Sequence, residues 1–61
     1  MPLVTVKMYE GRTNEQKKAL VEEITKAVVK TTLTTEDHVW VIIEDVAKTN
    51  WGMKGKLASE S

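Results

Sequence analysis

Val39-Trp40-Val41-Ile42-Ile43, residues 39–43, is the stretch that decides the fold. It is continuously apolar and rich in β-branched residues, which is typical of a strand covered on both faces. Because side chains alternate along a strand, Trp40 and Ile42 point to one side and the odd-numbered residues to the other. The acidic pair Glu44 and Asp45 is expected to end the strand. Both sides of this strand therefore need a covering layer.

Upstream of this strand, residues 14–32 are expected to form a helix. Thr13-Asn14-Glu15-Gln16 has the pattern of a capping box, in which the Thr13 hydroxyl accepts from the Gln16 amide and the Gln16 side chain reaches back. The connection at residues 33–38 is expected to contain one short helical turn begun by Thr35. Apolar or small residues recur along the helix at three- and four-residue spacing and form one stripe: Leu20, Val21, Ile24, Ala27, Val28 and Thr31.

Residues 3–9 alternate as another strand, and Gly11 then breaks the pattern with a turn conformation closed to other residues. Strand, helix and strand give a single β-α-β unit with parallel strands and a right-handed crossover, an α/β (α+β) fold. Gly52 and Gly55 predict a short C-terminal hairpin, and residues 59–61 are expected to fray. The chain, residues 1–61, is expected to be a single domain.

Self-association follows from the apolar pattern. One helix covers only one face of a two-stranded sheet, so the uncovered face would expose a large apolar patch that soluble monomers rarely tolerate. A chain of 61 residues is also marginal alone, and it has no cysteine and one histidine with which to build a disulfide or a structural metal site. We therefore expect a second copy of the chain to cover that face.

Composition excludes several functions. Nine basic residues balance nine acidic ones, which argues against a nucleic-acid partner bound through phosphate neutralisation. No apolar run approaches the ~20 residues of a membrane helix, so no membrane partner is expected. The amino terminus lacks the pattern of a signal peptide. Together with the absence of cysteine, these features favour a cytoplasmic protein.

Pro2 is the residue with the most informative chemistry. Initiator methionine is normally removed before proline, which leaves a secondary amine on a rigid ring at the start of a strand. Such an amine can act as a general base, provided that its surroundings disfavour its charged form. Arg12, the only arginine, has a planar guanidinium that can hold a carboxylate through two hydrogen bonds. Taken singly, each residue also has an ordinary interpretation: a common second residue and a solvated surface arginine.

The pieces together resemble one family. Pro2 opens a strand, Glu10-Gly11-Arg12 follows it, Thr13 to Lys17 begin a helix, and the tail has the pattern Gly-x-x-Gly-x-Leu. Over nearly the whole chain this combination is similar to the 4-oxalocrotonate tautomerase family. The resemblance implies a homo-oligomer built from dimers, most often a homohexamer, with active sites between subunits and with no metal or cofactor.

The resemblance also implies an activity and roles for residues. The activity is a cofactor-independent keto–enol tautomerase, an isomerase whose small-molecule substrate is a 2-hydroxy-dienoate or arylenolpyruvate acid. Pro2 would be the general base and then the acid that moves a proton between oxygen and carbon. Arg12 of a neighbouring subunit would bind a substrate carboxylate, and Trp51 matches the aromatic residue of the pocket wall.

Trp40 is a departure from the family pattern. The family's best-studied members carry a second arginine there, whereas tryptophan has one N–H donor and no charge. Loss of a cation at the reacting centre costs about 10²–10³-fold in rate where the cation stabilises an oxyanion. A substrate with an aromatic or uncharged end is therefore favoured over a dicarboxylate. Trp40 is interpreted either as part of the substrate pocket or as a packing residue at a subunit interface.

Two other functions stay open at this point. One is hydration or dehalogenation of a small unsaturated acid, and the other is a non-catalytic oligomeric module. Among the remaining polar residues, His38 is expected in a loop or at a strand start, and Tyr9 at an edge or interface. Lys7 and Lys48 are expected to be solvated.

Overall fold

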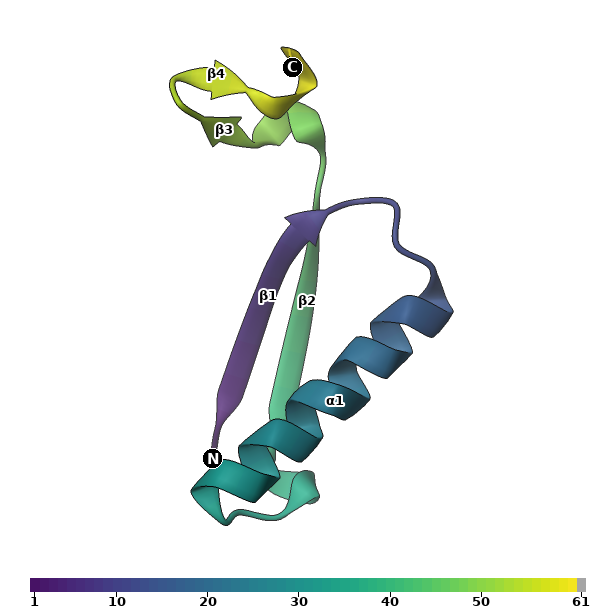
Figure 1. Ribbon diagram of the computed structural model, residues 1–61, viewed down its shortest axis with the longest axis vertical. Helices are drawn as coiled ribbons and strands as arrows, with labels where there is room; N and C mark the ends of the chain where they lie inside the picture. The colour runs from purple at the N-terminus through teal and green to yellow at the C-terminus, as the bar shows by residue number, and fades with distance from the viewer. Residues whose placement is uncertain (61) are drawn as a thin grey trace.

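A computed structural model describes residues 1–60 and confirms the β-α-β unit with a C-terminal hairpin (Figure 1). No helix within residues 1–60 is long and apolar enough to cross a membrane. The elements in chain order are β1 (Leu3–Tyr9), α1 (Asn14–Thr32), the 3₁₀ turn η1 (Glu36–His38), β2 (Trp40–Val46), the 3₁₀ turn η2 (Lys48–Asn50), β3 (Gly52–Met53), β4 (Lys56–Leu57) and the 3₁₀ turn η3 (Ala58–Glu60).

The helix α1 begins with the predicted capping box. The Gln16 backbone N–H donates to Thr13 Oγ1 at 3.1 Å, and the Thr13 N–H donates to Gln16 Oε1 at 2.9 Å. This pair satisfies two amides that the first turn of a helix otherwise leaves unpaired. At the other end, Leu33 closes the helix in the left-handed region, with φ 61°, and its N–H donates to the Val29 carbonyl.

The predicted apolar stripe of α1 is correct in its centre and wrong at its margins. Ala27 and Thr31 are exposed, whereas Thr25 and Val29 are half-buried in their place. The helix crosses the strands at an angle, so its covered face does not follow one straight line of residues (Figure 1). Near the helix end, Thr31 turns its hydroxyl back to donate to the Ala27 carbonyl at 2.8 Å.

The two long strands are parallel and in register from Leu3 opposite Trp40 to Tyr9 opposite Val46. The prediction that Glu44 and Asp45 end β2 is wrong, because the strand continues through both to Val46. Each acidic side chain has a basic partner at this point of the fold. Asp45 forms an ion pair with Lys17 of α1, and Glu44 lies opposite Lys7, with 3.9 Å between Nζ and Oε2. The start of β2 also differs from the prediction by one residue. Val39, predicted as the first strand residue, instead closes η1, and its N–H donates to the Glu36 carbonyl.

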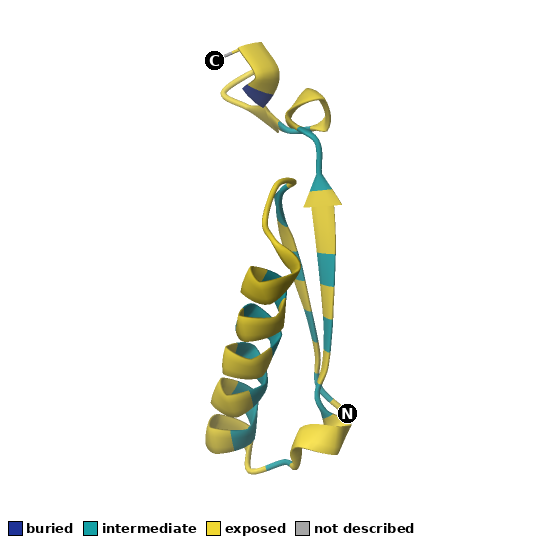
Figure 2. Cartoon of the chain, turned by 90° about the vertical axis from the view of Figure 1, so that its right-hand side faces the viewer, coloured by how far each residue is buried: buried dark blue, intermediate teal, exposed yellow. Residues whose placement is uncertain are grey.

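Only one face of the sheet is covered (Figure 2). On the face toward α1, alternate residues of both strands are half-buried, among them Val4, Val6, Val41 and Ile43. On the opposite face, here called the outer face, Leu3 is 56% exposed, Trp40 57% and Ile42 47%. The expected uncovered apolar face is therefore present in the isolated chain.

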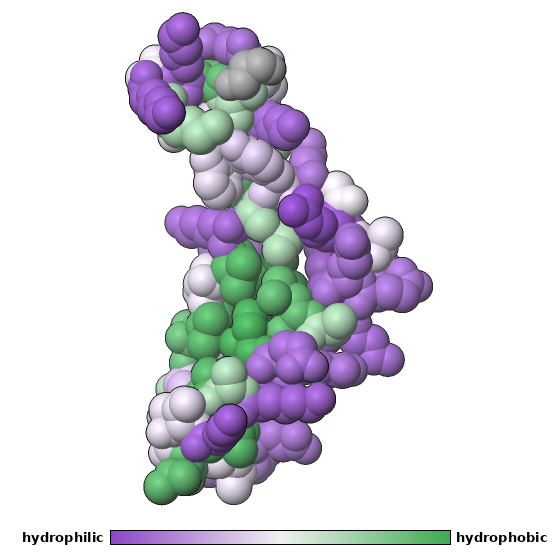
Figure 3. All heavy atoms as spheres, in the orientation of Figure 1, coloured by the Kyte–Doolittle hydropathy of each residue, from purple (hydrophilic) through white to green (hydrophobic). Residues whose placement is uncertain are grey.

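The covered face is itself incompletely closed. Apolar atoms beside α1 remain visible from outside (Figure 3). Among residues 1–60, Ala58 is the one apolar residue classed as buried, and it lies in the C-terminal segment rather than under α1. A single chain thus has no enclosed core in its β-α-β unit, as expected of a protein whose core is completed by further copies.

Residues 48–60, here called the arm, extend beyond the ends of the two long strands (Figure 1). Lys54 and Gly55 both have positive φ, 55° and 77°, as a tight two-residue hairpin turn requires. The Ala58 N–H donates to the Trp51 carbonyl at 2.7 Å and closes the base of the arm. The prediction that the end frays is wrong for residues 59–60, which belong to η3, and residue 61 lies outside the described residues.

The exposed outer face generates a first prediction. We expect Ile42→Lys to prevent association, because a charge at the centre of a face that a second copy covers would be desolvated. The measurement is molar mass by size-exclusion chromatography with light scattering. Ala19→Lys, which adds the same charge at an exposed position of α1, is the matched control and should associate as the parent does. An Ile42→Lys protein with the parent's mass would contradict this use of the outer face.

Candidate functional site

Pro2 and Trp40 lie together at one end of the strands. The Trp40 N–H donates to the Pro2 carbonyl at 3.0 Å, which extends the parallel ladder by one residue below Leu3. Pro2 is half-buried, whereas Met1 before it is 80% exposed. The backbone of Pro2 is thus fixed by β2, while the residue that blocks its nitrogen projects into solvent.

Arg12 lies at the other end of the same strand. It follows Gly11, whose φ of 119° turns the chain out of β1, and it precedes Thr13, the residue that caps α1. Its side chain is exposed. β1 has seven residues, so Pro2 and Arg12 of one chain are separated by about 20 Å, more than an arginine side chain can reach.

Trp51 lies at the base of the arm and packs against the end of β1. Its ring centroid is 4.7 Å from that of Tyr9, with 67° between the ring planes, a T-shaped contact. Lys48 Nζ lies 5.4 Å from the centroid of the same Tyr9 ring. The interpretation of Lys48 as simply solvated is therefore incomplete, because its ammonium is within cation–π distance of Tyr9.

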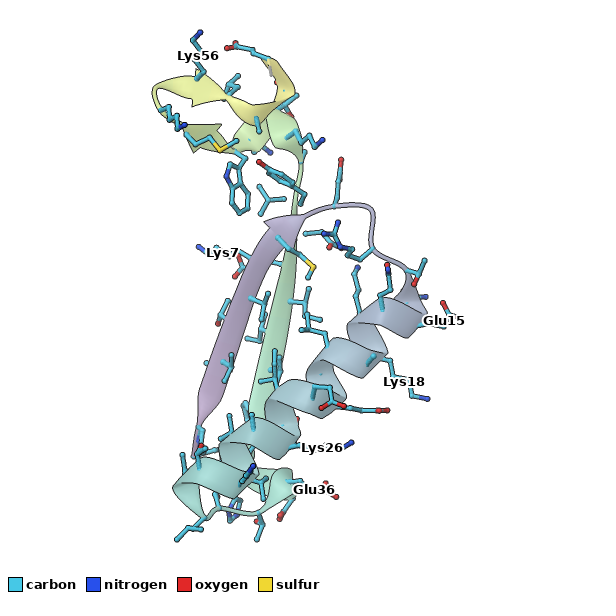
Figure 4. The ribbon with its side chains drawn as sticks, in the orientation of Figure 1. Lys7, Glu15, Lys18, Lys26, Glu36 and Lys56 are labelled. Carbon is cyan, nitrogen blue, oxygen red and sulfur yellow. The ribbon has the colours of Figure 1, made fainter. Side chains whose placement is uncertain are left out.

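A hollow of about 350 Å³ lies beside Trp51. It brings residues of β1, β2 and the arm together, and none of the other predicted site residues lines it. Lys7 extends from β1 on the side away from α1 (Figure 4) and faces Glu44 across the ladder. The lining residues are Lys7, Glu44, Val46, Asn50, Trp51 and Gly52.

A second hollow, of about 470 Å³, lies between α1 and η1 and contains no predicted site residue. Three acidic side chains, Glu22, Glu36 and Asp37, contribute to its lining. The Thr35 hydroxyl donates to Asp37 at 2.6 Å and lowers the pKa of that carboxyl. His38 belongs to the same short turn, as predicted, with its Nδ1 3.4 Å from Thr35 Oγ1. This hollow has neither an aromatic wall nor an arginine.

The four predicted residues therefore form two pairs. Pro2 and Trp40 lie beside each other where the two strands start. Arg12 comes shortly after the end of β1 in the chain, and Trp51 comes shortly after the end of β2. Within one chain, the candidate base Pro2 therefore has no arginine beside it, and the candidate anion-binding residue Arg12 has no candidate base beside it. The contact of Tyr9 with Trp51 is the feature that sequence reasoning missed, because the arm folds back on β1 through residues 42 positions apart in the chain.

Known proteins of one family are similar to this chain over almost its entire length. The family model described as "Tautomerase enzyme" matches residues 2–60. A 2-hydroxymuconate tautomerase of Bacillus subtilis is 50% identical over 60 residues, which are 98% of this chain and 97% of that protein. A probable tautomerase of Bacillus cereus is 52% identical, with 98% of each chain covered.

Solved structures match equally well. The crystal structure of YwhB, a homologue of 4-oxalocrotonate tautomerase, superposes with a TM-score of 0.95 at 48% identity, with 98% of each chain covered. A heterohexamer 4-oxalocrotonate tautomerase from Chloroflexus aurantiacus superposes with a TM-score of 0.93 at 32% identity, covering 98% of this chain and 97% of that one.

Proposed function

Because this chain belongs to the tautomerase enzyme family and is an isomerase, we propose that it ketonises small enol acids with Pro2 as general base and acid. The substrate is a 2-hydroxy-dienoate or an arylenolpyruvate. The Pro2 nitrogen takes the proton from the enol oxygen, and the resulting ammonium donates a proton to carbon. The reaction moves one proton and changes no oxidation state, so it needs no cofactor.

The position of Pro2 supports this role. Its carbonyl is fixed by the Trp40 N–H, so the ring is presented at a defined point with little freedom left to lose. Met1 is 80% exposed and therefore accessible to removal. Once Met1 is gone, Pro2 has a secondary amine, whereas with Met1 present its nitrogen is an amide without basicity.

The separation of Pro2 from Arg12 supports a site shared between copies. Two sheets that align antiparallel place the start of the strands of one copy beside the end of the strands of the other. The Pro2 end of one chain then meets the Arg12 and Trp51 end of its neighbour. In a two-fold arrangement the same exchange happens twice, which yields two equivalent sites. We propose such a dimer as the building block of a homohexamer.

In this shared site Arg12 binds the substrate carboxylate through both of its terminal nitrogens, and Trp51 forms the apolar wall. A wall that excludes water disfavours the charged amine and strengthens the hold of Arg12 on the carboxylate. Arg12 is exposed in the single chain and has no ion pair among the described residues, so it is available to a neighbouring site.

Trp40 determines which end group the substrate carries. It is 57% exposed on the outer face, and its backbone N–H is hydrogen-bonded to the Pro2 carbonyl, which fixes the backbone of Trp40 beside the proposed base. An indole beside the base offers a flat apolar surface and no charge. We therefore propose that an arylenolpyruvate is a better substrate than the dicarboxylate 2-hydroxymuconate.

Replacement of the base gives the first functional prediction. We expect Pro2→Ala to lower kcat for the ketonisation of phenylenolpyruvate, followed by ultraviolet absorbance, by at least about 10²-fold. Intact mass must confirm that both proteins lack Met1. An unchanged rate would exclude Pro2 as the base. If the parent itself is no faster than buffer, haloacrylates are the next substrates, because hydration or dehalogenation also uses an amino-terminal proline.

Restoring a cation gives the second functional prediction. We expect Trp40→Arg to raise kcat/KM for 2-hydroxymuconate by about 10²-fold, because a guanidinium then faces the developing charge and the second carboxylate. It should not raise kcat/KM for phenylenolpyruvate. Trp40→Leu, which removes the ring without adding charge, is the control. Equal losses for both substrates in both variants would instead identify Trp40 as a packing residue between subunits.

A further inference from the structure

Tyr9 joins the arm to the β-α-β unit. It is the last residue of β1, and it contacts the arm at two points: its ring meets Trp51 in a T-shaped pair, and Lys48 Nζ lies 5.4 Å from its centroid. Lys48 is the first residue of the single turn η2, and Trp51 directly follows its last residue. One aromatic side chain therefore contacts both ends of the segment from which the arm starts.

Trp51 occupies the central position in this segment. Its carbonyl accepts from the Ala58 N–H at 2.7 Å, and its own N–H donates to the Lys48 carbonyl at 3.4 Å. These bonds fix its backbone but leave its side chain torsions to be decided by contacts. On one side the indole meets Tyr9, and on another it lines the hollow of about 350 Å³.

We propose that Tyr9 is a positioning residue for the reaction: its ring holds the Trp51 indole in the orientation in which it forms the wall of the neighbouring active site. This inference rests on the proposed role of Trp51. An aromatic T-shaped pair and a cation–π contact each contribute modestly, and together they select one orientation of the indole and of the arm. Within one chain Tyr9 lies at the opposite end of β1 from Pro2.

The kinetic test is a double-mutant cycle with phenylenolpyruvate. Tyr9→Leu should lower kcat/KM about tenfold, chiefly through KM, because a misplaced wall weakens substrate binding. Tyr9→Phe keeps the ring and should stay within about twofold of the parent. The double variant Tyr9→Leu with Trp51→Leu should lose no more than Trp51→Leu alone, since Tyr9 acts only through Trp51.

Two kinetic results would overturn the proposal: losses that multiply in the double variant, or a Tyr9→Leu protein with the parent's kcat/KM. Light scattering on each variant confirms that assembly is intact. A merely structural role for Tyr9 would give losses that are independent of Trp51, so the cycle separates the two roles.

Fluorescence gives a readout that does not depend on turnover. The chain has two tryptophans, so in a Trp40→Phe background, excited at a wavelength that tyrosine does not absorb, Trp51 alone emits. Tyr9→Leu in this background should shift the emission to longer wavelength as the indole leaves its contact, and Tyr9→Phe should not. Unchanged emission in Tyr9→Leu would overturn the proposal. Failure of the proposed function appears separately, as full activity of Pro2→Ala, and the emission spectra still decide whether Tyr9 holds Trp51.

Discussion

A two-stranded sheet has two faces, and in this protein a single helix covers one of them. The other face carries Leu3, Trp40 and Ile42, each about half exposed, and the β-α-β unit encloses no core of its own. Burial of apolar surface is the main favourable term in folding, so most of what stabilises this fold must come from contacts with further copies. We therefore propose that folding and assembly are one process for this chain.

The length of the strands also separates the proposed site residues within one chain. Strands of seven residues place Pro2 and Trp40 about 20 Å from Arg12 and the arm, so one chain contains all the proposed groups and yet no complete site. In the proposed dimer, association that covers the outer face also brings opposite strand ends together. Under this proposal, stability and activity depend on the same contacts, and a lone chain lacks both.

Much of this was predictable from the sequence, because strong local patterns decide it. The capping box at Thr13, the tail glycines Gly52 and Gly55, and the apolar run of β2 each specify an element within a few residues. The length of β2 was not predictable, because Glu44 and Asp45 look like a strand end until Lys7 and Lys17 are placed beside them by the fold. The Tyr9–Trp51 contact was missed for the same reason, since it joins distant residues. The site roles rest on resemblance rather than on pattern.

The central claim is that each active site draws Pro2 from one copy and Arg12 from its neighbour, and subunit complementation tests it most directly. Pro2→Ala and Arg12→Ala chains, each inactive alone, are unfolded together in equal amounts and refolded. Random pairing gives one intact site in each mixed pair, so the account predicts recovery of about a quarter of the parent's activity toward phenylenolpyruvate. A refolded mixture no more active than its two components would contradict the account, because it would place both residues in a site within one chain.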